Sequence, residues 1–380
     1  MRLNELIEKL CPDGVEFLEL SSILDYEQPG KYIVKDTNYN DTYKTPVLTA
    51  GQTFVLGYTD EKEGIFFASK DNPVIIFDDF TTSFHWVDFD FKVKSSAMKM
   101  LRPKKGIPVC FRFVYYAMKN IEYIPSDHTR QWIEKYSEFR IPVPPIEVQD
   151  EIVQILDNFT ELTAELTAEL TARKKQYEFY SKKLLEFDEL NIEYLSLSEV
   201  ASFKNGKGHE QSICDDGDFI VVNSKFISSN SAVKKYSNEQ LCPVFKDDIL
   251  MVMSDLPNGK ALAKCFMVDL DNKYTLNQRI GCFTNICSKL RTKFLYYVLN
   301  RNEQLLKYDN GVDQTNLRKD DILAIDIPIP SLEEQDKIIE KLDLLNLYCN
   351  DVEAVLPKEI ELRKKQYEYY RKKLISFMEI

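Results

Sequence analysis

The sequence predicts a mixed fold, α/β (mixed α+β), in which two globular domains alternate with two long helices. Two observations predict this layout. IPVPPIEVQD at residue 141 returns as IPIPSLEEQD at residue 327, and RKKQYEFY at residue 173 returns as RKKQYEYY at residue 363. Short apolar runs such as PVIIF and DILMVM, which are typical of strands, precede each copy. The repeat of roughly 190 residues is far longer than a solenoid repeat, so the chain is a domain duplication.

We expect four segments, because the matched stretches mark where each globular domain ends. The first ten residues, MRLNELIEKL, alternate charge with Leu and Ile, which predicts an amphipathic helix rather than a secretory signal. The expected division is a first globular domain over 1–140 (with the helix at 1–10), a helical segment over 141–190, a second globular domain over 191–326 and a second helical segment over 327–380.

The two helical segments are the clearest secondary-structure predictions. Pro144 and Pro145 favour a helix start, and Ser331 with Glu334 has the spacing of a capping box. A helix over 146–187 would be roughly 60 Å long and needs a partner to cover its apolar stripe, which the second copy provides in a coiled-coil-like pair. Pro357 in the second copy is expected to kink or break that helix. The stripe consists of Ile152, Ile155, Leu156, Phe159, Leu162, Leu166 and Leu170.

The first helix contains a repeated Thr-Ala-Glu-Leu unit between residues 160 and 172. Four residues are close to one helical turn, so one added unit lengthens the helix by about 6 Å and rotates the stripe by only about 40°. The repeat therefore predicts a spacer of adjustable length. The simpler alternative is a chance repeat of good helix formers.

Composition excludes several classes of protein. No run of about 18 apolar residues exists, so we expect no membrane span and a cytoplasmic protein. The eight cysteines form no Cys-x-x-Cys pair and there are three histidines, which predicts reduced thiols and no metal site. The net charge of −12 is unusual for a nucleic-acid-binding chain, so the position of the charges matters more than their sum.

Two acid-free basic stretches, 91–121 and 272–302, occur at similar places in the two repeats. Clustered Lys and Arg side chains neutralise DNA phosphates, so a basic face is predicted in each domain. The candidate phosphate contacts are Lys92, Lys94, Lys99, Arg102, Lys104, Lys105 and Arg112 in the first repeat, and Lys273, Arg279, Lys289, Arg291 and Lys293 in the second.

Sequence is read by side chains that reach base edges, and polar residues on loops are the candidates. We selected them from TAGQTF, DDFTTSFHW, KNGKGHEQ, VNSKF and DLPNGKA. The candidates are Gln52, Thr81, Thr82 and His85 in the first domain, and Asn205, Lys207, His209, Asn223, Lys225 and Lys260 in the second.

The repeated I-P-[VI]-P-x-x-E-x-Q-D-x-I and R-K-K-Q-Y-E-[FY]-Y motifs, with the Thr-Ala-Glu-Leu units, resemble the specificity subunit of a type I restriction–modification system. The resemblance implies two target recognition domains, each reading one half of a bipartite double-stranded DNA target. It also implies an antiparallel coiled-coil spacer with a pseudo-two-fold axis, and a first helix that lies near the C-terminus.

The same resemblance implies that the chain itself is not catalytic and holds no cofactor. It would bind two modification subunits, which methylate adenine with S-adenosylmethionine. Through them it would bind restriction subunits, which use ATP and magnesium.

Two other functions are compatible with parts of the sequence. PVIIFDD ends in Asp78 and Asp79, and Asp90 and Lys92 follow, so a magnesium-dependent nuclease site is conceivable, although the second repeat has no counterpart. A non-catalytic, two-headed coiled-coil adaptor that binds protein partners would also explain the helices. An adaptor would not require a basic stretch in both domains.

Overall fold

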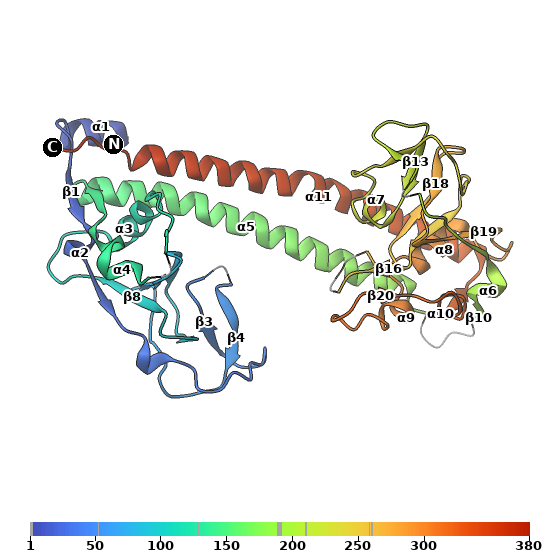
Figure 1. Ribbon diagram of the computed structural model, residues 1–380, viewed down its shortest axis with the longest axis horizontal. Helices are drawn as coiled ribbons and strands as arrows, with labels where there is room; N and C mark the ends of the chain where they lie inside the picture. The colour runs from blue at the N-terminus through green and yellow to red at the C-terminus, as the bar shows by residue number, and fades with distance from the viewer. Residues whose placement is uncertain are drawn as a thin grey trace. The chain divides into compact units, whose positions relative to one another are not determined.

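The computed structural model describes residues 3–51, 53–127, 129–187, 192–209, 211–257, 259 and 261–380, and of residues 349–354 only the backbone (Figure 1). The chain forms two compact units, Met1–Glu169 with Val355–Ile380 (unit 1) and Leu170–Ala354 (unit 2). Each unit therefore contains one globular domain and a part of each long helix. The predicted mixed α/β class is confirmed.

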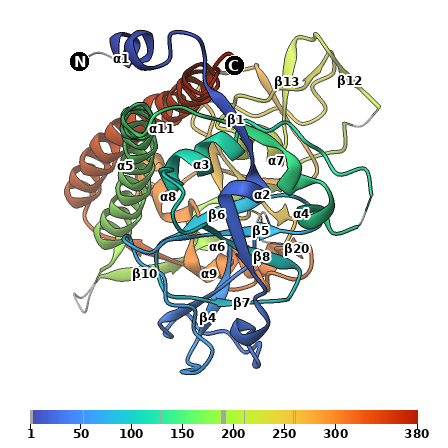
Figure 2. The same ribbon diagram turned by 90° about the vertical axis from the view of Figure 1, so that its left-hand side faces the viewer.

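Unit 1 has two small sheets. One is antiparallel with strand order β2-β8-β5-β6, and β5, β6 and β8 lie side by side in Figure 2. The other has the order β4-β3-β7, in which β3 is antiparallel to β4 and parallel to β7. The strands are β2 (Leu24–Glu27), β3 (Thr45–Leu48), β4 (Val55–Thr59), β5 (Val74–Asp78), β6 (Phe84–Val87), β7 (Lys92–Val93) and β8 (Met98–Pro103).

Unit 2 has two corresponding sheets built from later strands, the second with one additional strand, β12, paired to β14. Its antiparallel sheet has the order β11-β19-β15-β17, and in its second sheet β13 is antiparallel to β14 and parallel to β18. The duplication read from the helical motifs therefore extends to strand order. The strands are β11 (Ser202–Asn205), β12 (Ile213–Cys214), β13 (Phe219–Val222), β14 (Tyr236–Ser237), β15 (Ile249–Val252), β17 (Cys265–Met267), β18 (Tyr274–Leu276) and β19 (Ile280–Thr284), with β16 (Ser254–Asp255) paired to β20 (Thr315–Asn316).

A separate strand pair closes each domain just before its long helix. β1 (Glu16–Glu19) pairs with β9 (Arg140–Val143), and β10 (Glu193–Ser196) pairs with β21 (Asp326–Ile329). These pairs join the start of each domain to its end. The shorter helices are α2 (Leu20–Ile23), α3 (Phe111–Met118) and α4 (Gln131–Glu134), with 3₁₀ turns at Gly30–Tyr32 and Tyr136–Glu138; in unit 2 they are α6 (Leu197–Val200), α7 (Ser224–Ser228), α8 (Thr292–Leu299), α9 (Glu303–Leu306) and α10 (Lys319–Leu323).

The long helices are α5 (Ile146–Leu185) and α11 (Leu332–Leu374). Of the predicted stripe on α5, Ile152 and Leu156 are buried, whereas Leu162 within the Thr-Ala-Glu-Leu region is 36% exposed. α11 runs through Pro357 without interruption, so the expected break is wrong. One lost hydrogen bond, worth about 3 kcal/mol with the ring clash, does not outweigh a helix of 43 residues.

The N-terminal helix α1 (Leu3–Leu10) packs at the C-terminal end of α11 within unit 1 (Figure 1). Leu3 and Ile375 belong to one apolar cluster, and the amide of Val15 donates to the carbonyl of Met378 at 2.9 Å. Gly14 permits this approach, because its φ is +111° and a Cβ there would lie 2.5 Å from that carbonyl oxygen. The expectation that the N-terminal helix lies near the C-terminus is met for the described residues 3–10.

Candidate DNA interface and domain-to-helix joint

Three loops of unit 1 meet at one end of its sheets. The amide of Asp79 donates to Ala97 O at 3.2 Å, and the amide of Lys94 donates to Leu48 O at 3.0 Å. The hydroxyl of Ser83 donates to Ala50 O at 2.6 Å. These bonds join the connections after β3, β5 and β7. We call residues 49–54, 79–83 and 94–97 the loop end of unit 1.

The topologically equivalent connections of unit 2 also meet. The amide of Asn277 donates to Val222 O at 3.1 Å, and the amide of Met253 donates to Arg279 O at 3.0 Å. The strand β11 ends beside them, since Asn205 pairs with Gly281. We call residues 205–209, 223–235, 253–264 and 277–279 the loop end of unit 2.

The described base-reading candidates of the first domain, Thr81, Thr82 and His85, lie at or beside the loop end of unit 1. The Nε2 atom of His85 lies 2.8 Å from Gly51 O, and the ring of Phe54 stacks on the imidazole with centroids 4.6 Å apart. Burial lowers the pKa of His85, so the ring is mainly neutral near pH 7. Thr81 is exposed, whereas Thr82 is buried. Gln52 lies outside the described residues.

In the second domain the candidates separate into exposed and structural groups. Asn205, Lys207 and Lys225 are exposed. Asn223 is half-buried and caps α7, because its Oδ1 atom accepts from Phe226 N at 2.9 Å. Lys260 lies outside the described residues.

His209 is a correction to the sequence prediction. It is 1% exposed, and its two ring nitrogens lie 2.7 Å from Lys207 O and 2.8 Å from the Thr275 hydroxyl. A side chain that is buried with both nitrogens occupied has no edge to offer a base. His209 therefore holds the 205–209 segment on β18.

Lys92 and Lys99 are corrections of the same kind. They are 1% and 0% exposed, and their ammonium groups lie 2.9 Å from a carboxylate oxygen of Glu61 and 3.1 Å from one of Asp79. The Lys99 contact lacks hydrogen-bond geometry and is purely ionic. Neither lysine reaches a phosphate. The sequence suggested exposed lysines because the stretch 91–121 itself contains no acidic residue. The carboxylate partners, Glu61 and Asp79, come from earlier in the chain.

The carboxylates that suggested a nuclease are used within the domain. Asp78 accepts the amides of Phe80 and Thr81 at 2.9 and 2.8 Å, and Asp90 accepts the amide of Ala68 at 3.1 Å. Among the described residues, no three His, Cys, Asp or Glu side chains are grouped as metal ligands.

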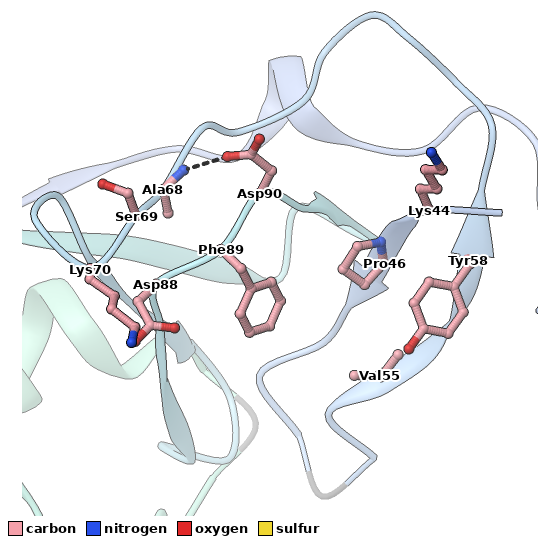
Figure 3. A pocket seen from close by; sticks show the side chains of 10 residues that line it. All are labelled: Lys44, Pro46, Val55, Tyr58, Ala68, Ser69, Lys70, Asp88, Phe89 and Asp90. Carbon is pink, nitrogen blue, oxygen red and sulfur yellow. Dashed lines mark hydrogen bonds between the residues drawn. The ribbon is translucent and has the colours of Figure 1, made fainter.

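An open pocket lies beside Asp90, with the ring of Phe89 directed into it (Figure 3). Its charged lining is balanced, with Lys44 and Lys70 against Asp88 and Asp90, so it is not selective for anions. The lining is completed by Pro46, Val55, Tyr58, Ala68 and Ser69.

Away from the loop end of each domain, an aspartate on the long helix accepts hydrogen bonds from side chains of a short helix, α3 in unit 1 and α8 in unit 2. Asp157 accepts hydrogen bonds from Arg112 Nε at 2.8 Å and from the Tyr116 hydroxyl. Burial, and next this hydrogen bond, raise the pKa of Tyr116.

Unit 2 repeats this arrangement. Asp343 accepts from Lys293 Nζ at 2.7 Å and from the Tyr297 hydroxyl at 2.5 Å. Burial, and next the bond to Asp343, raise the pKa of Tyr297. Arg112 and Lys293, predicted as phosphate contacts, therefore attach each domain to its helix.

A fully buried glutamine completes each joint. Gln149 donates to Pro144 O at 2.7 Å and accepts from Cys110 N at 2.8 Å. Gln335 donates to Pro330 O at 2.9 Å and to Lys289 O at 2.8 Å, and accepts from Arg291 N at 2.7 Å. We call these contacts, with those of Asp157 and Asp343, the joint of each unit.

The other predicted phosphate contacts divide between the two ends. Near the joint, Lys104 donates to Ser21 O at 2.7 Å, Lys289 pairs with Glu193 at 2.8 Å, and Arg291 pairs with Asp336 at 2.9 Å. Lys105 is exposed there.

Two of the remaining predicted residues are half-buried away from the loop ends. Arg102 covers the ring of Phe66 at 4.7 Å, and Lys273 donates to Asp218 O at 3.1 Å. Lys94 and Arg279 are exposed at the turns that connect β7 to β8 and β18 to β19. These two residues lie at the loop ends with exposed side chains, as do Lys207 and Lys225.

The sequence reasoning missed the joint residues Gln149, Asp157, Gln335 and Asp343. A signal was present, because each pair lies at the same offset as the repeated I-P-[VI]-P motif. Among the described residues, none of the helices has the length and apolar character needed to cross a bilayer.

Comparison with known proteins gives a consistent result. The type I restriction modification DNA specificity domain family matches the chain twice, over residues 12–173 and 189–362. The chain is 41% identical to the type I restriction enzyme EcoR124I/EcoR124II specificity subunit of Escherichia coli over 399 aligned positions, which cover 98% of this chain and 96% of that protein.

Two solved structures share the fold. The type I restriction-modification S subunit from M. genitalium aligns with a TM-score of 0.53 at 17% identity, covering 96% of this chain and 98% of that one. A chain from a study of complex assembly and conformational transition of the type I R-M system aligns with a TM-score of 0.57 at 13% identity, with the same coverage of 96% and 98%.

Proposed function

Since this chain belongs to the type I restriction–modification DNA specificity family, we propose that it selects the DNA sequence for such a complex, each globular domain reading one half of a bipartite target. The main support for this proposal is that the loop ends of the two units have the same strand connections but different residues. A shared scaffold with different polar loops suits two different half-sites.

The target recognition domains are proposed to span residues 1–140 and 191–326, with 141–190 and 327–380 as the spacer. An antiparallel pairing of α5 with α11 is supported by two contacts. Phe159 stacks on Tyr370 with centroids 5.5 Å apart, and the Tyr177 hydroxyl donates to Asn346 at 2.7 Å. Residue numbers rise along one helix as they fall along the other. Such a pair would relate the two domains by a pseudo-two-fold axis, matching the opposed strands of duplex DNA.

The DNA contacts are proposed to come from the exposed residues of the loop ends. Lys94 and Arg279 would bind phosphates, and Thr81, Asn205, Lys207 and Lys225 would face base edges. Gln52 and Lys260 remain candidates from sequence. Lys105, near the joint, stays a prediction from the sequence.

Two modification subunits are proposed to bind the helical segments, with restriction subunits joining through them. The support is apolar surface that the chain itself leaves open. On α11, Leu344 and Leu347 are 52% and 59% exposed, and Leu362 is 56% exposed. Such exposure is expected where another helix packs. The chain itself is proposed to be non-catalytic, and the adaptor function is not favoured.

Mapping methylated adenines tests the proposed function. Cells that make the partner subunits would be compared with and without this chain. We expect a bipartite motif that appears only when the chain is present. Methylation that is independent of the chain, or a motif with a single half-site, would contradict the proposal.

A further inference from the structure

A short segment outside the predicted site residues recurs in the two repeats. DHTRQWI at 127–133 and DQTNLRK at 313–319 share Asp and Thr and lie at the offset that relates Gln149 to Gln335. The likeness is weak in sequence, and the structure strengthens it. The amide of Gln131 donates to Asp79 O at 2.8 Å, and the amide of Leu317 donates to Met253 O at 2.8 Å.

These two bonds attach the recurring segments to equivalent places. Asp79 begins the connection from β5 to β6, and Met253 begins the connection from β15 to β17. Arg130 and Asn316, the residues just before the donating amides, therefore occupy matched positions at the two loop ends. Both are exposed.

The backbone under each residue is fixed. In unit 1, Asp127 accepts from the Thr129 hydroxyl at 2.6 Å and from Gln131 Nε2 at 3.0 Å. The Thr129 hydroxyl, followed by Lys135, lowers the pKa of Asp127, so this carboxylate is ionised at neutral pH. The guanidinium of Arg130 has no hydrogen-bond or ion-pair partner among the described residues.

In unit 2 the segment forms strand β20. Asn316 is paired with Ser254 in the backbone register, and Gln314 Nε2 donates to the Ser254 hydroxyl at 2.8 Å. A side chain that projects from an ordered backbone can bind without the cost of ordering that backbone, which suits a recognition residue.

Resting on the proposed function, we propose that Arg130 and Asn316 are matched base-reading residues, one for each half-site. An arginine fork pairs with O6 and N7 of guanine, and an asparagine amide pairs with N6 and N7 of adenine. Arg130 thus specifies a guanine in the half-site of the first domain, and Asn316 specifies an adenine in the half-site of the second.

The test maps methylation in cells carrying Arg130→Ala, Arg130→Lys or Asn316→Ala in the full chain with its partner subunits. We expect Arg130→Ala to reduce discrimination at one guanine of one half-site by roughly ten- to a hundred-fold, leaving the other half-site and the separation unchanged. Asn316→Ala should do the same at one adenine of the other half-site.

Arg130→Lys keeps the charge and exchanges the rigid fork for a single flexible ammonium, which can still donate to O6 and N7 of guanine. We expect it to restore part, but not all, of the discrimination at that guanine. Alanine variants with unchanged motifs would overturn the inference while leaving the bipartite methylation by the unaltered chain intact. Loss of that bipartite methylation would instead overturn the proposed function.

If a variant abolishes methylation, the inference is tested by DNA binding instead. The purified complex is titrated at reduced salt with duplexes that differ by one base pair at a time. A loss of preference at one position supports the inference. Equal weakening on every duplex overturns it.

Discussion

The joints and the loop ends differ in what the two units share. At the joints, Gln149 and Gln335, and Asp157 and Asp343, make corresponding hydrogen bonds in the two units, with one further bond from Gln335 to Lys289 O. At the loop ends, the connection after β5 covers residues 79–83, whereas the equivalent connection after β15 covers 253–264. The duplicated fold therefore keeps the contacts that attach each domain to its helix, whereas the surface proposed to face DNA differs between the units.

The largest effect is expected from removing the joint glutamines. Gln149→Leu and Gln335→Leu each leave a buried proline carbonyl and a partly buried amide unpaired, which costs about 3 kcal/mol of unfolding free energy. Denaturant unfolding of the purified chain measures this cost. Gln176→Leu, an exposed position on α5, is the matched control. Equal stability of the three variants would show that the glutamine contacts do not stabilise the joints.

A smaller effect is expected at the joint carboxylates. Asp157→Asn and Asp343→Asn should each destabilise by about 1–2 kcal/mol, since a charge-assisted hydrogen bond is exchanged for a neutral one at a half-exposed site. Similar losses in the two units would show that the joints are energetically equivalent. A measurable loss in one unit alone would break the equivalence.

The joint tyrosines predict a pH dependence. The pKa values of Tyr116 and Tyr297 are raised by burial and then by their carboxylate partners, so their contribution to stability is complete below about pH 10 and is lost as pH rises above it. Tyr116→Phe and Tyr297→Phe should therefore make alkaline destabilisation shallower. Unfolding midpoints measured between pH 8 and pH 11 test this, and parallel curves for mutant and parent would contradict it.

At the loop ends, a uniform effect on DNA affinity is expected. Lys94→Ala and Arg279→Ala each remove one proposed phosphate contact, so the slope of log affinity against log salt should fall by about 1 without a change in the methylated motif. Salt titrations of duplex binding by the full complex measure the slope. An altered motif would assign these residues to base reading instead.

The smallest effect is expected at the C-terminal ends of α3 and α8, the short helices that the joints attach. Lys119 and Asn300 end equivalent helices, and burial lowers the pKa of Lys119 to about 8. A lowered lysine pKa costs stability at low pH, and the cost disappears as pH rises from about 8 toward the unfolded value. Lys119→Asn should remove this rise, so the stability of the variant relative to the parent should be most favourable near pH 7 and fall as the pH rises above 8. Persistence of the rise would assign it to another group.

The sequence predicts the parts of the fold that local patterns encode. The duplication, the long helices and the loops containing Thr81 and Asn205 follow from repeats, apolar spacing and turn residues. Strand order does not, because strands distant in the chain pair through tertiary packing. The roles of Lys92 and Lys99 were also out of reach, since Glu61 and Asp79 meet them only in the folded domain.

The most direct test of the division between reading and spacing is the deletion of residues 167–170, one Thr-Ala-Glu-Leu unit of α5. The deletion shortens the helix by about 6 Å and rotates it by about 40° while leaving both loop ends and both joints untouched. Methylated adenines would be mapped in cells that make the shortened chain with its partner subunits. We predict that both half-sites stay the same and that their separation shortens. An altered half-site, or an unchanged separation, would contradict the account.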